Sequence, residues 1–243
     1  MVRRKELYTM RRCKCAILAQ KLKLLRTGKP DKAGLMFIKR GHKAPSGHAN
    51  RANARMNEPT AWDIKMVLQE TPNTMFLTIS RRAAAQLNRW AVDALFADEH
   101  PLCYLPIEAD DDKSWAEEVP VYPGMRITLT RNLNKKIGFV NGMGGTVLAM
   151  GQAGLLVRTD QQRTIMVHPW TDENRVTAFP FRLGYASTLH KVQGATLEHI
   201  TLWLDLPNMP AAAYVALSRV QMDAHWRFLG NPTRHYFSPA RFD

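Results

Sequence analysis

The sequence predicts an α/β protein in which a parallel sheet with flanking helices is interrupted by a small antiparallel β-barrel. A short apolar strand, TMFLTIS (residues 74–80), is followed directly by RRAAAQLNRWAVDALF (81–96), whose apolar residues fall on one face of a helix. Four short strand-like runs, separated by turn signals, follow between residues 118 and 172. From Phe181 onward strands and helices alternate again, which is typical of a parallel sheet covered by helices.

The segment before the first strand is predicted to be partly helical. Apolar residues recur at spacings of three and four between residues 7 and 27, and Gly28 is a stop signal. Residues 41–59 are rich in Gly, Pro, Asn and Ala and contain almost no large apolar side chain. We therefore expect an exposed connection with little fixed structure between this helix and the first strand.

The later elements divide the chain into domains. Strands are predicted in FRLGYAST (181–188), ITLWLDL (200–206) and HWRFLG (225–230), with a helix in AAAYVALSRV (211–220). The acidic stretch EADDDKSWAEE (108–118) is expected to be a linker at a boundary. The expected domains are a basic N-terminal segment (1–73), an α/β domain (74–117 and 173–232), an inserted barrel (118–172) and a tail (233–243).

The charge of the chain is concentrated near its start. The formal net charge is +13, and residues 1–65 hold 17 Lys or Arg against 4 Asp or Glu, whereas the remainder holds 17 of each. Such a basic block suits a polyanion, nucleic acid above all. A solvated tail and a mitochondrial presequence are the alternatives.

Cysteine content and hydropathy bear on the compartment. Three cysteines make neither a disulfide framework nor a zinc site, and no apolar stretch approaches the roughly 20 residues that cross a bilayer. We expect a soluble, intracellular protein without a structural metal, with nucleus and mitochondrion both open.

The stretch YASTLHKVQGATL (185–197) holds the candidate functional residues. Thr188 and His190 are two apart in a segment predicted to be extended, so they should face the same side, and with Lys191 they are good donors to phosphate oxygens. The Gln193–Gly194 pair allows a second ligand to approach the backbone closely. A capped loop with an ordinary histidine is the alternative, and Arg219 could likewise be an ordinary cation at a helix end.

Two motifs together favour the functional interpretation. T-L-H-K-x-Q-G-x-T-L (188–197) and Y-V-A-L-S-R-V (214–220) resemble helicase motifs V and VI of superfamily one, in the RecD-like branch, and are most similar to PIF-type (petite integration frequency) DNA helicases. P-G-M-R-I-T-L-T-R-N and F-V-N-G-M-G-G-T-V (123–147) resemble the barrel inserted in the second motor lobe of that family. L-T-I-S-R-R with Gln86-Leu87-Asn88 resembles its motif IV. The resemblance covers roughly residues 74–230 and, more loosely, the region near Leu25.

This resemblance implies a RecA-like second motor lobe and a set of site residues. Arg219 would be the arginine finger that reaches the γ-phosphate of ATP, and Arg81 a second γ-phosphate contact, with Arg82 as its competitor. Gln193 and Gly194 would couple the nucleotide to DNA. The nucleic-acid contacts would be Thr188, His190, Lys191 and Asn141. The partner would be single-stranded or forked DNA, with RNA as an alternative, and movement would run five-prime to three-prime.

The motifs of a first motor lobe do not occur in the sequence. G-x-x-x-x-G-K-[ST] and an acidic pair for Mg²⁺ are both absent, since Gly28-Lys29 is followed by Pro30. We therefore expect the C-terminal half of an ATP-dependent helicase, in which ATP and Mg²⁺ bind only together with a first lobe. The alternative is a nucleic-acid-binding remnant without ATPase activity, such as a fragment of a mobile element.

Overall fold

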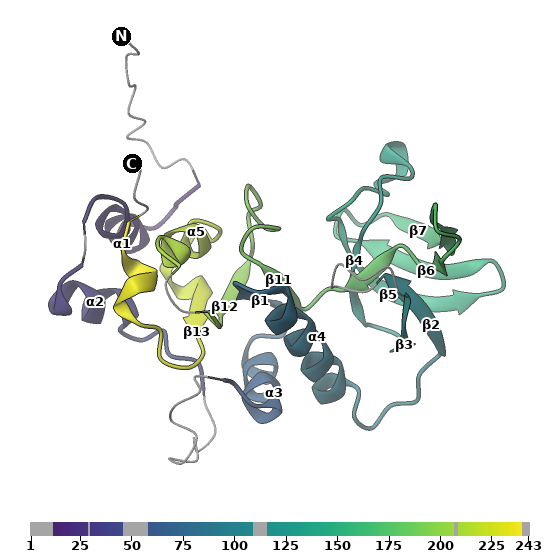
Figure 1. Cartoon of the computed structure of the whole chain (residues 1–243), viewed down its shortest axis with the longest axis horizontal. Coiled ribbons are helices and arrows are strands. Elements are labelled where there is room, and N and C mark those ends of the chain that lie inside the picture. Colours follow the sequence, from purple (N-terminus) through teal and green to yellow (C-terminus); the bar gives the residue numbers. More distant parts are fainter. Residues whose placement is uncertain (1–11, 29, 46–57, 109–115, 207–208, 240–243) are drawn as a thin grey trace, which may run out of the picture. The chain divides into compact units, whose positions relative to one another are not determined.

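The computed structural model describes residues 12–28, 30–45, 58–108, 116–206 and 209–239. The chain divides into two compact units (Figure 1). The first unit comprises Met1–Ile79 and Thr188–Asp243, and the second comprises Ser80–Ser187. No described helix is both long enough and apolar enough to cross a membrane.

A four-stranded sheet forms the centre of the first unit. Its strand order is β11-β1-β12-β13, with bounds β11 (Ala186–Thr188), β1 (Thr74–Thr78), β12 (His199–Leu202) and β13 (Trp226–Phe228). β1 pairs with β12 in parallel, and β12 pairs with β13 in parallel. The predicted parallel sheet is therefore confirmed. All four residues of β12 are buried, as expected for a central strand covered on both faces.

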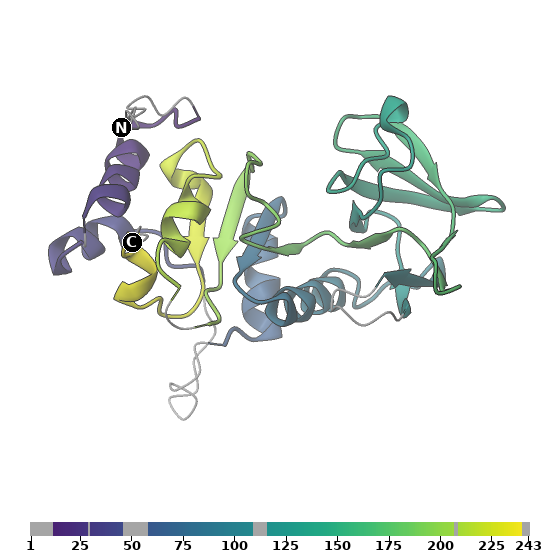
Figure 2. The ribbon, with the colours of Figure 1, turned by 45° about the horizontal axis from the view of Figure 1, so that its top comes forward.

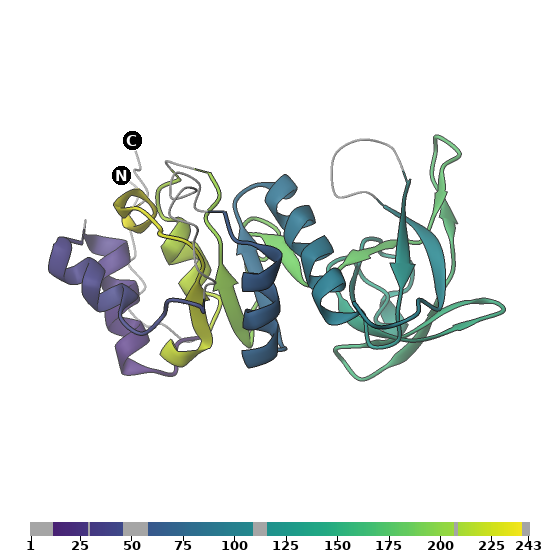
Figure 3. The ribbon, with the colours of Figure 1, turned by 90° about the horizontal axis from the view of Figure 1, so that it is seen from below.

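Helices cover both faces of this sheet (Figure 3). α1 and α5 lie on one face together with α2, and α3 lies on the other. The helical bounds are α1 (Ala16–Thr27), α2 (Lys32–Lys39), α3 (Ala61–Glu70), α5 (Ala212–Leu217), η3 (Asp223–His225) and η4 (Arg234–Phe237). α3 begins with a reciprocal cap, because the Thr60 side chain accepts from the Asp63 N–H and the Asp63 carboxylate accepts from the Thr60 N–H.

The N-terminal helices belong to the core of the first unit. Leu18, Leu22 and Leu25 of α1 are buried in the same cluster as residues of α5, β12 and β13. α1 begins at Ala16, so the helix expected from residue 7 starts later, and residues 1–11 lie outside the described part. The described lysines and arginines of α1 and α2 therefore belong to helices that pack on an apolar core.

Part of the expected exposed connection is also packed. His42 and Ala44 are buried, and the backbone exchanges hydrogen bonds with β13: Phe228 N–H donates to His42 O (2.8 Å) and Ala44 N–H donates to Phe228 O (2.9 Å). The expectation of an exposed segment from residue 41 was wrong here, because strand-like pairing buries side chains that the composition alone assigns to a loop. Residues 46–57 lie outside the described part.

The second unit combines an α-helix with antiparallel strands (Figure 2). Its five-stranded sheet has the order β10-β4-β5-β6-β7, and β2-β3 and β8-β9 form separate pairs. The bounds are α4 (Arg81–Leu95), β2 (Cys103–Glu108), β3 (Ala116–Val121), β4 (Arg126–Leu129), η2 (Lys135–Ile137), β5 (Gly144–Gly151), β6 (Gly154–Thr159), β7 (Thr164–Val167), β8 (Trp170–Thr171), β9 (Thr177–Ala178) and β10 (Phe181–Leu183).

The acidic stretch expected to be a linker is partly strand. Glu108 pairs with Ala116, and Glu117 and Glu118 continue the β2–β3 ladder. Residues 109–115 lie outside the described part. The acidic composition marked this region as a linker but did not show that its two flanks pair as antiparallel strands.

The predicted strand 181–188 is divided by Gly184. Its first part, β10, pairs with β4 of the antiparallel sheet, and its second part, β11, belongs to the parallel sheet. A Cβ atom at Gly184 would lie 2.8–2.9 Å from backbone atoms of Ile127, closer than real side chains approach. Glycine therefore permits the close approach of the two backbones at the point where the chain, at the end of β10, leaves its pairing with β4.

Asn88 of α4 fixes the segment that leads into β11. Its buried Oδ1 accepts from the N–H groups of Tyr185 (2.9 Å) and Ala186 (2.7 Å), and its Nδ2 donates to Ala186 O (3.2 Å).

We expect Asn88→Ala to lower the free energy of unfolding by about 2–3 kcal/mol, because buried backbone donors lose their acceptor. Chemical denaturation measures this. Arg89→Ala, which removes an exposed ion pair with Glu117, is the control and should cost well under about 1 kcal/mol. If both variants lose the same free energy of unfolding, Asn88 does not hold the segment that leads into β11.

A buried histidine makes stability depend on pH. His199 begins β12, and its Nδ1 lies 2.9 Å from Thr74 Oγ1. Burial, followed by the charges of Arg227 and His225, lowers the pKa of His199 to about 4. Since an unfolded histidine titrates near pH 6.5, the unfolded chain takes up a proton first as the pH falls, and stability is lost from about pH 6.5 down to about pH 4.

We therefore expect the free energy of unfolding to fall by about 2 kcal/mol between pH 7 and pH 5 through this residue. His199→Gln should flatten the pH dependence in denaturation curves recorded across this range, and His100→Gln, at an exposed position, should leave it steep. A slope unchanged by the His199 variant would show that the histidine is not kept neutral by the fold.

Candidate functional site

The motif at residues 188–197 leaves the sheet at the carboxyl end of β1 and leads to the start of β12, where His199 pairs with Thr74 at the amino end of β1. The N–H of Leu189 donates to Thr78 O (2.9 Å), which starts the loop at that edge of the sheet. Successive turns follow, in which Lys191, Gln193 and Ala195 N–H groups donate to the carbonyl three residues earlier. Ligands of parallel α/β sheets bind at such carboxyl edges, so the loop lies where the fold class would place a site.

The loop alternates buried anchors with exposed polar groups. Leu189 and Val192 are buried, whereas four of the predicted site residues are exposed: His190, Lys191, Gln193 and Gly194. Gly194 has φ +93°, a left-handed conformation that favours glycine. The loop therefore displays an imidazole, an ammonium and an amide from a fixed apolar base.

Thr188 does not share this exposure. The sequence placed Thr188 and His190 on one side of an extended segment, but the strand ends at Thr188, which is 5% exposed, and a turn begins at the next residue. The backbone carbonyl of Thr188 accepts from Lys191 N–H (3.1 Å). The expected common face was wrong because the alternation of side chains holds only while the strand continues.

Arg219 follows α5 and lies beside this loop. Its Nε donates to Val215 O (3.0 Å), its Nη2 lies 2.7 Å from Ser218 Oγ, and its Nη1 lies 3.5 Å from Val192 O. The Leu197 N–H also donates to Arg219 O (2.8 Å). The two sequence motifs are thus brought together, with the guanidinium of one reaching the loop of the other. The contact with Val215 O is also what a cation at a helix end makes.

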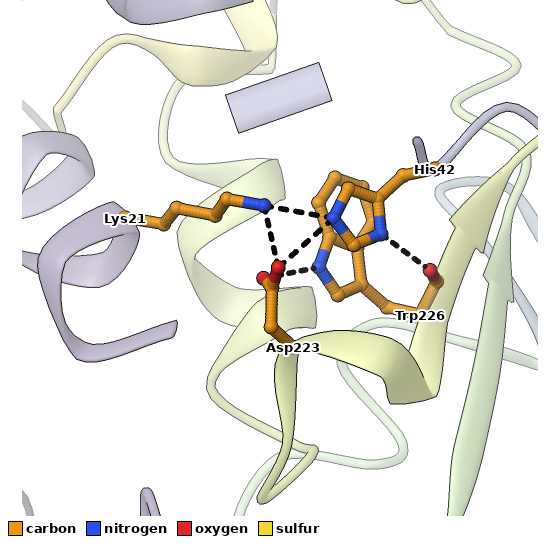
Figure 4. Close-up of polar contacts among 4 residues, drawn as sticks. All are labelled: Lys21, His42, Asp223 and Trp226. Carbon is orange, nitrogen blue, oxygen red and sulfur yellow. Dashed lines mark hydrogen bonds and ion pairs between the residues drawn. The ribbon is translucent and has the colours of Figure 1, made fainter. Parts of the chain in front are cut away.

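A buried ion pair fastens the segment after Arg219 (Figure 4). The ammonium of Lys21, from α1, lies 2.8 Å from Asp223 Oδ2, and Trp226 Nε1 donates to Asp223 Oδ1 (3.2 Å). Burial alone would raise the pKa of Asp223, but the hydrogen bonds from Lys21 and Trp226 outweigh it and lower that pKa. The cluster therefore ties α1 to η3, four residues beyond Arg219.

His42 completes this cluster. Its ring stacks on Trp226 at a centroid distance of 3.9 Å, and its Nδ1 lies 2.9 Å from Trp226 O, so Nδ1 carries the proton. Nε2 then accepts from Lys21 Nζ (2.7 Å). Burial lowers the pKa of His42. A second proton on Nε2 would face the Lys21 ammonium as well as Asp223 Oδ2 (3.2 Å), and burial outweighs the carboxylate, so the arrangement suits a neutral histidine.

Two predicted site residues belong to the second unit. Arg81 is the first residue of α4 and is exposed. Asn141 is also exposed, and its N–H donates to Asn132 Oδ1 (2.9 Å) in the loop between β4 and β5. Their roles as phosphate and DNA contacts stay predictions.

Sequence reasoning did not find three residues that hold the segments around Arg219. Arg12 and Lys21 were seen only as members of the basic block, and Asp223 was not singled out. Arg12 contacts residues 182 and 206 positions away, and Lys21 pairs with a carboxylate 202 positions away. No local pattern marks contacts of that separation.

Two curated sequences with similarity to this chain are DNA helicases. The chain is 35% identical over 129 residues to the ATP-dependent DNA helicase Pif1 of Bdellovibrio bacteriovorus, covering 48% of this chain and 29% of that protein. It is 30% identical over 135 residues to the ATP-dependent DNA helicase PIF1 of Danio rerio, covering 51% of this chain and 21% of that protein. The chain thus spans less than a third of these relatives. No protein-family model matches it.

Solved structures agree in fold. A crystal structure of Pif1 helicase from Bacteroides in complex with ADP-AlF3 and single-stranded DNA matches with a TM-score of 0.66 at 19% identity, covering 94% of this chain and 52% of that one. The RecA-like parallel sheet with helices, together with antiparallel sheets, is therefore the fold of this chain. In sequence and in fold, the chain is thus similar to part of the longer Pif1 helicases.

Proposed function

We propose that this chain is the second motor lobe of an ATP-dependent DNA helicase, in which Arg219 is the arginine finger and the 188–194 loop contacts single-stranded DNA. One observation carries the proposal: Arg219 is held against the 188–194 loop and the segment after it, since its Nη1 lies 3.5 Å from Val192 O and its backbone O accepts from Leu197 N–H (2.8 Å). Because the loop and the Arg219 segment are in contact, a ligand that displaces the loop can also displace the guanidinium.

The chemistry of the donors suits phosphate. Arg219 offers a planar cation that matches phosphate oxygens, and His190 and Lys191 offer exposed donors on the adjacent loop. Among the described residues, no group of three or more His, Cys, Asp and Glu is placed to hold a metal. We therefore propose that ATP binds here through its terminal phosphate, and that Mg²⁺ is held by residues of a first lobe.

The finer assignments belong to the same proposal. The antiparallel strands of the second unit would form the inserted barrel, with Asn141 as a DNA contact. Arg81 would be a second γ-phosphate contact, and Gln193 with Gly194 would relay the nucleotide state to Thr188 and His190. Movement would run five-prime to three-prime on single-stranded DNA.

Binding of the chain to a single-stranded oligonucleotide tests the DNA part. We expect weak binding without sequence preference whose affinity falls steeply with salt, because phosphate contacts release counterions. Lys191→Gln should lower the slope of log affinity against log salt by about 0.7, the contribution of one contact to a single strand. Fluorescence anisotropy at several salt concentrations gives this slope.

The control concerns the basic N-terminal segment. Deleting residues 1–65 would remove α1 and α2 and part of the core, so single substitutions are the sharper test. Lys32→Gln removes one exposed charge from that segment. If it changes the slope as much as Lys191→Gln does, the basic block contributes equally to binding; if Lys191→Gln has no effect, the loop is not a DNA contact.

A further inference from the structure

Arg12 forms a bridge between the 188–194 loop and the segment that carries Arg219. Its Nη2 donates to Gly194 O (2.8 Å) and its Nη1 donates to Ser218 O (3.0 Å). Two nitrogens of one planar guanidinium thus hold carbonyls from two loops at once. A lysine ammonium lacks the fixed fork that this geometry uses.

The segment that supplies Arg12 is itself anchored. Two residues further on, Lys14 N–H donates to Gln221 O (2.9 Å), and α1 then enters the core. The buried Lys21–Asp223 pair holds the same helix against η3. The Arg12 side chain is therefore presented from a fixed base rather than from a free terminus.

Arg12 and Arg219 are also electrostatically coupled. Burial, followed by the Arg12 charge, lowers the pKa of Arg219, so two cations lie close together. Within the described part of the chain, both guanidinium groups contact carbonyl oxygens, and that of Arg219 also contacts a hydroxyl group. An anion bound by Arg219 would relieve this repulsion. The contacts of Arg12 should thus respond to an anion bound by Arg219 as well as to the position of the 188–194 loop.

We propose that Arg12 is a positioning residue that transmits occupancy of the 188–194 loop by single-stranded DNA to the backbone that carries Arg219. This inference rests on the proposed function, since it concerns the same loop and the same arginine. The link is physical: a displacement of Gly194 O is passed through one guanidinium to Ser218 O, the carbonyl adjacent to Arg219.

Hydrogen exchange of the full chain, with and without a single-stranded oligothymidylate, tests it. In the wild type we expect DNA to slow exchange in two peptides, one covering residues 189–198 and the other 215–222. In Arg12→Ala the DNA effect should be confined to 189–198. Without DNA, the same variant should exchange roughly fivefold to tenfold faster in both peptides, because two charge-assisted hydrogen bonds are lost.

Two further variants separate geometry from charge. Arg12→Lys keeps the charge and should behave like Arg12→Ala. Lys14→Ala removes one charge two residues away, where only the backbone N–H has a partner in the described structure, and should behave like the wild type. If DNA slows exchange in residues 215–222 of Arg12→Ala or Arg12→Lys as much as in the wild type, the inference is overturned.

Failure of DNA binding has a separate meaning. If no oligonucleotide binds to the wild type at any salt concentration tested, the proposed function fails. The bridge is then judged on exchange without DNA: faster exchange in Arg12→Ala but not in Lys14→Ala supports a link between the two loops. Equal exchange in both variants overturns it.

Discussion

Arg219→Ala is expected to abolish ATP hydrolysis, by about 10³-fold or more, in a protein that joins this chain to a first lobe with a Walker sequence. The guanidinium would stabilise charge on the transferring phosphoryl group, and arginine fingers contribute about 10³–10⁵ in rate in other systems. ATP binding and unfolding free energy should change little, because the side chain is only half-buried and its described partners are its own helix end and the adjacent loop. Steady-state ATPase and unwinding assays measure the loss.

Arg219→Lys is the matched control for charge. It should not restore turnover, since a point charge lacks the planar fork that spans two phosphate oxygens. The chain alone, which has no Walker sequence, supplies the baseline of the assay. A variant at position 219 that keeps more than roughly a tenth of wild-type turnover would show that Arg219 is only a cation at a helix end.

Asp223→Asn is expected to lower the free energy of unfolding by about 3–5 kcal/mol. The substitution keeps an oxygen for the Trp226 N–H but leaves Lys21, a residue that is 2% exposed, without its counter-charge. Breaking one side of a buried ion pair costs far more than the pair itself contributes. Urea denaturation at neutral pH measures the change.

A double substitution separates the ion pair from general damage at η3. Lys21→Met with Asp223→Asn removes both charges, so the double variant should be more stable than Asp223→Asn alone. If the double variant is less stable by the sum of both single effects, the two residues act independently and the pair does not hold α1 to η3. The exposed pair Arg89–Glu117 provides a comparison of small effect.

The sequence determined the elements whose signal is local. β1 and α4 are where the apolar pattern predicted them, and the parallel sheet follows from the alternation of strands and helices. The motifs at residues 188–197 and 214–220 led to the helicase resemblance that the comparisons confirm. In each case a few neighbouring residues carry the information, because helix and strand periodicity and turn chemistry act over short separations.

Tertiary structure decided what depends on distant contacts. The division of residues 181–188 at Gly184 follows from the approach of Ile127, and the burial of His42 and Ala44 follows from pairing with Phe228. The bridge made by Arg12 is of the same kind. Whether a charged side chain is a solvated surface group or the link between two loops depends on which carbonyls the fold brings within about 3 Å of it, and that distance is not written in any local pattern.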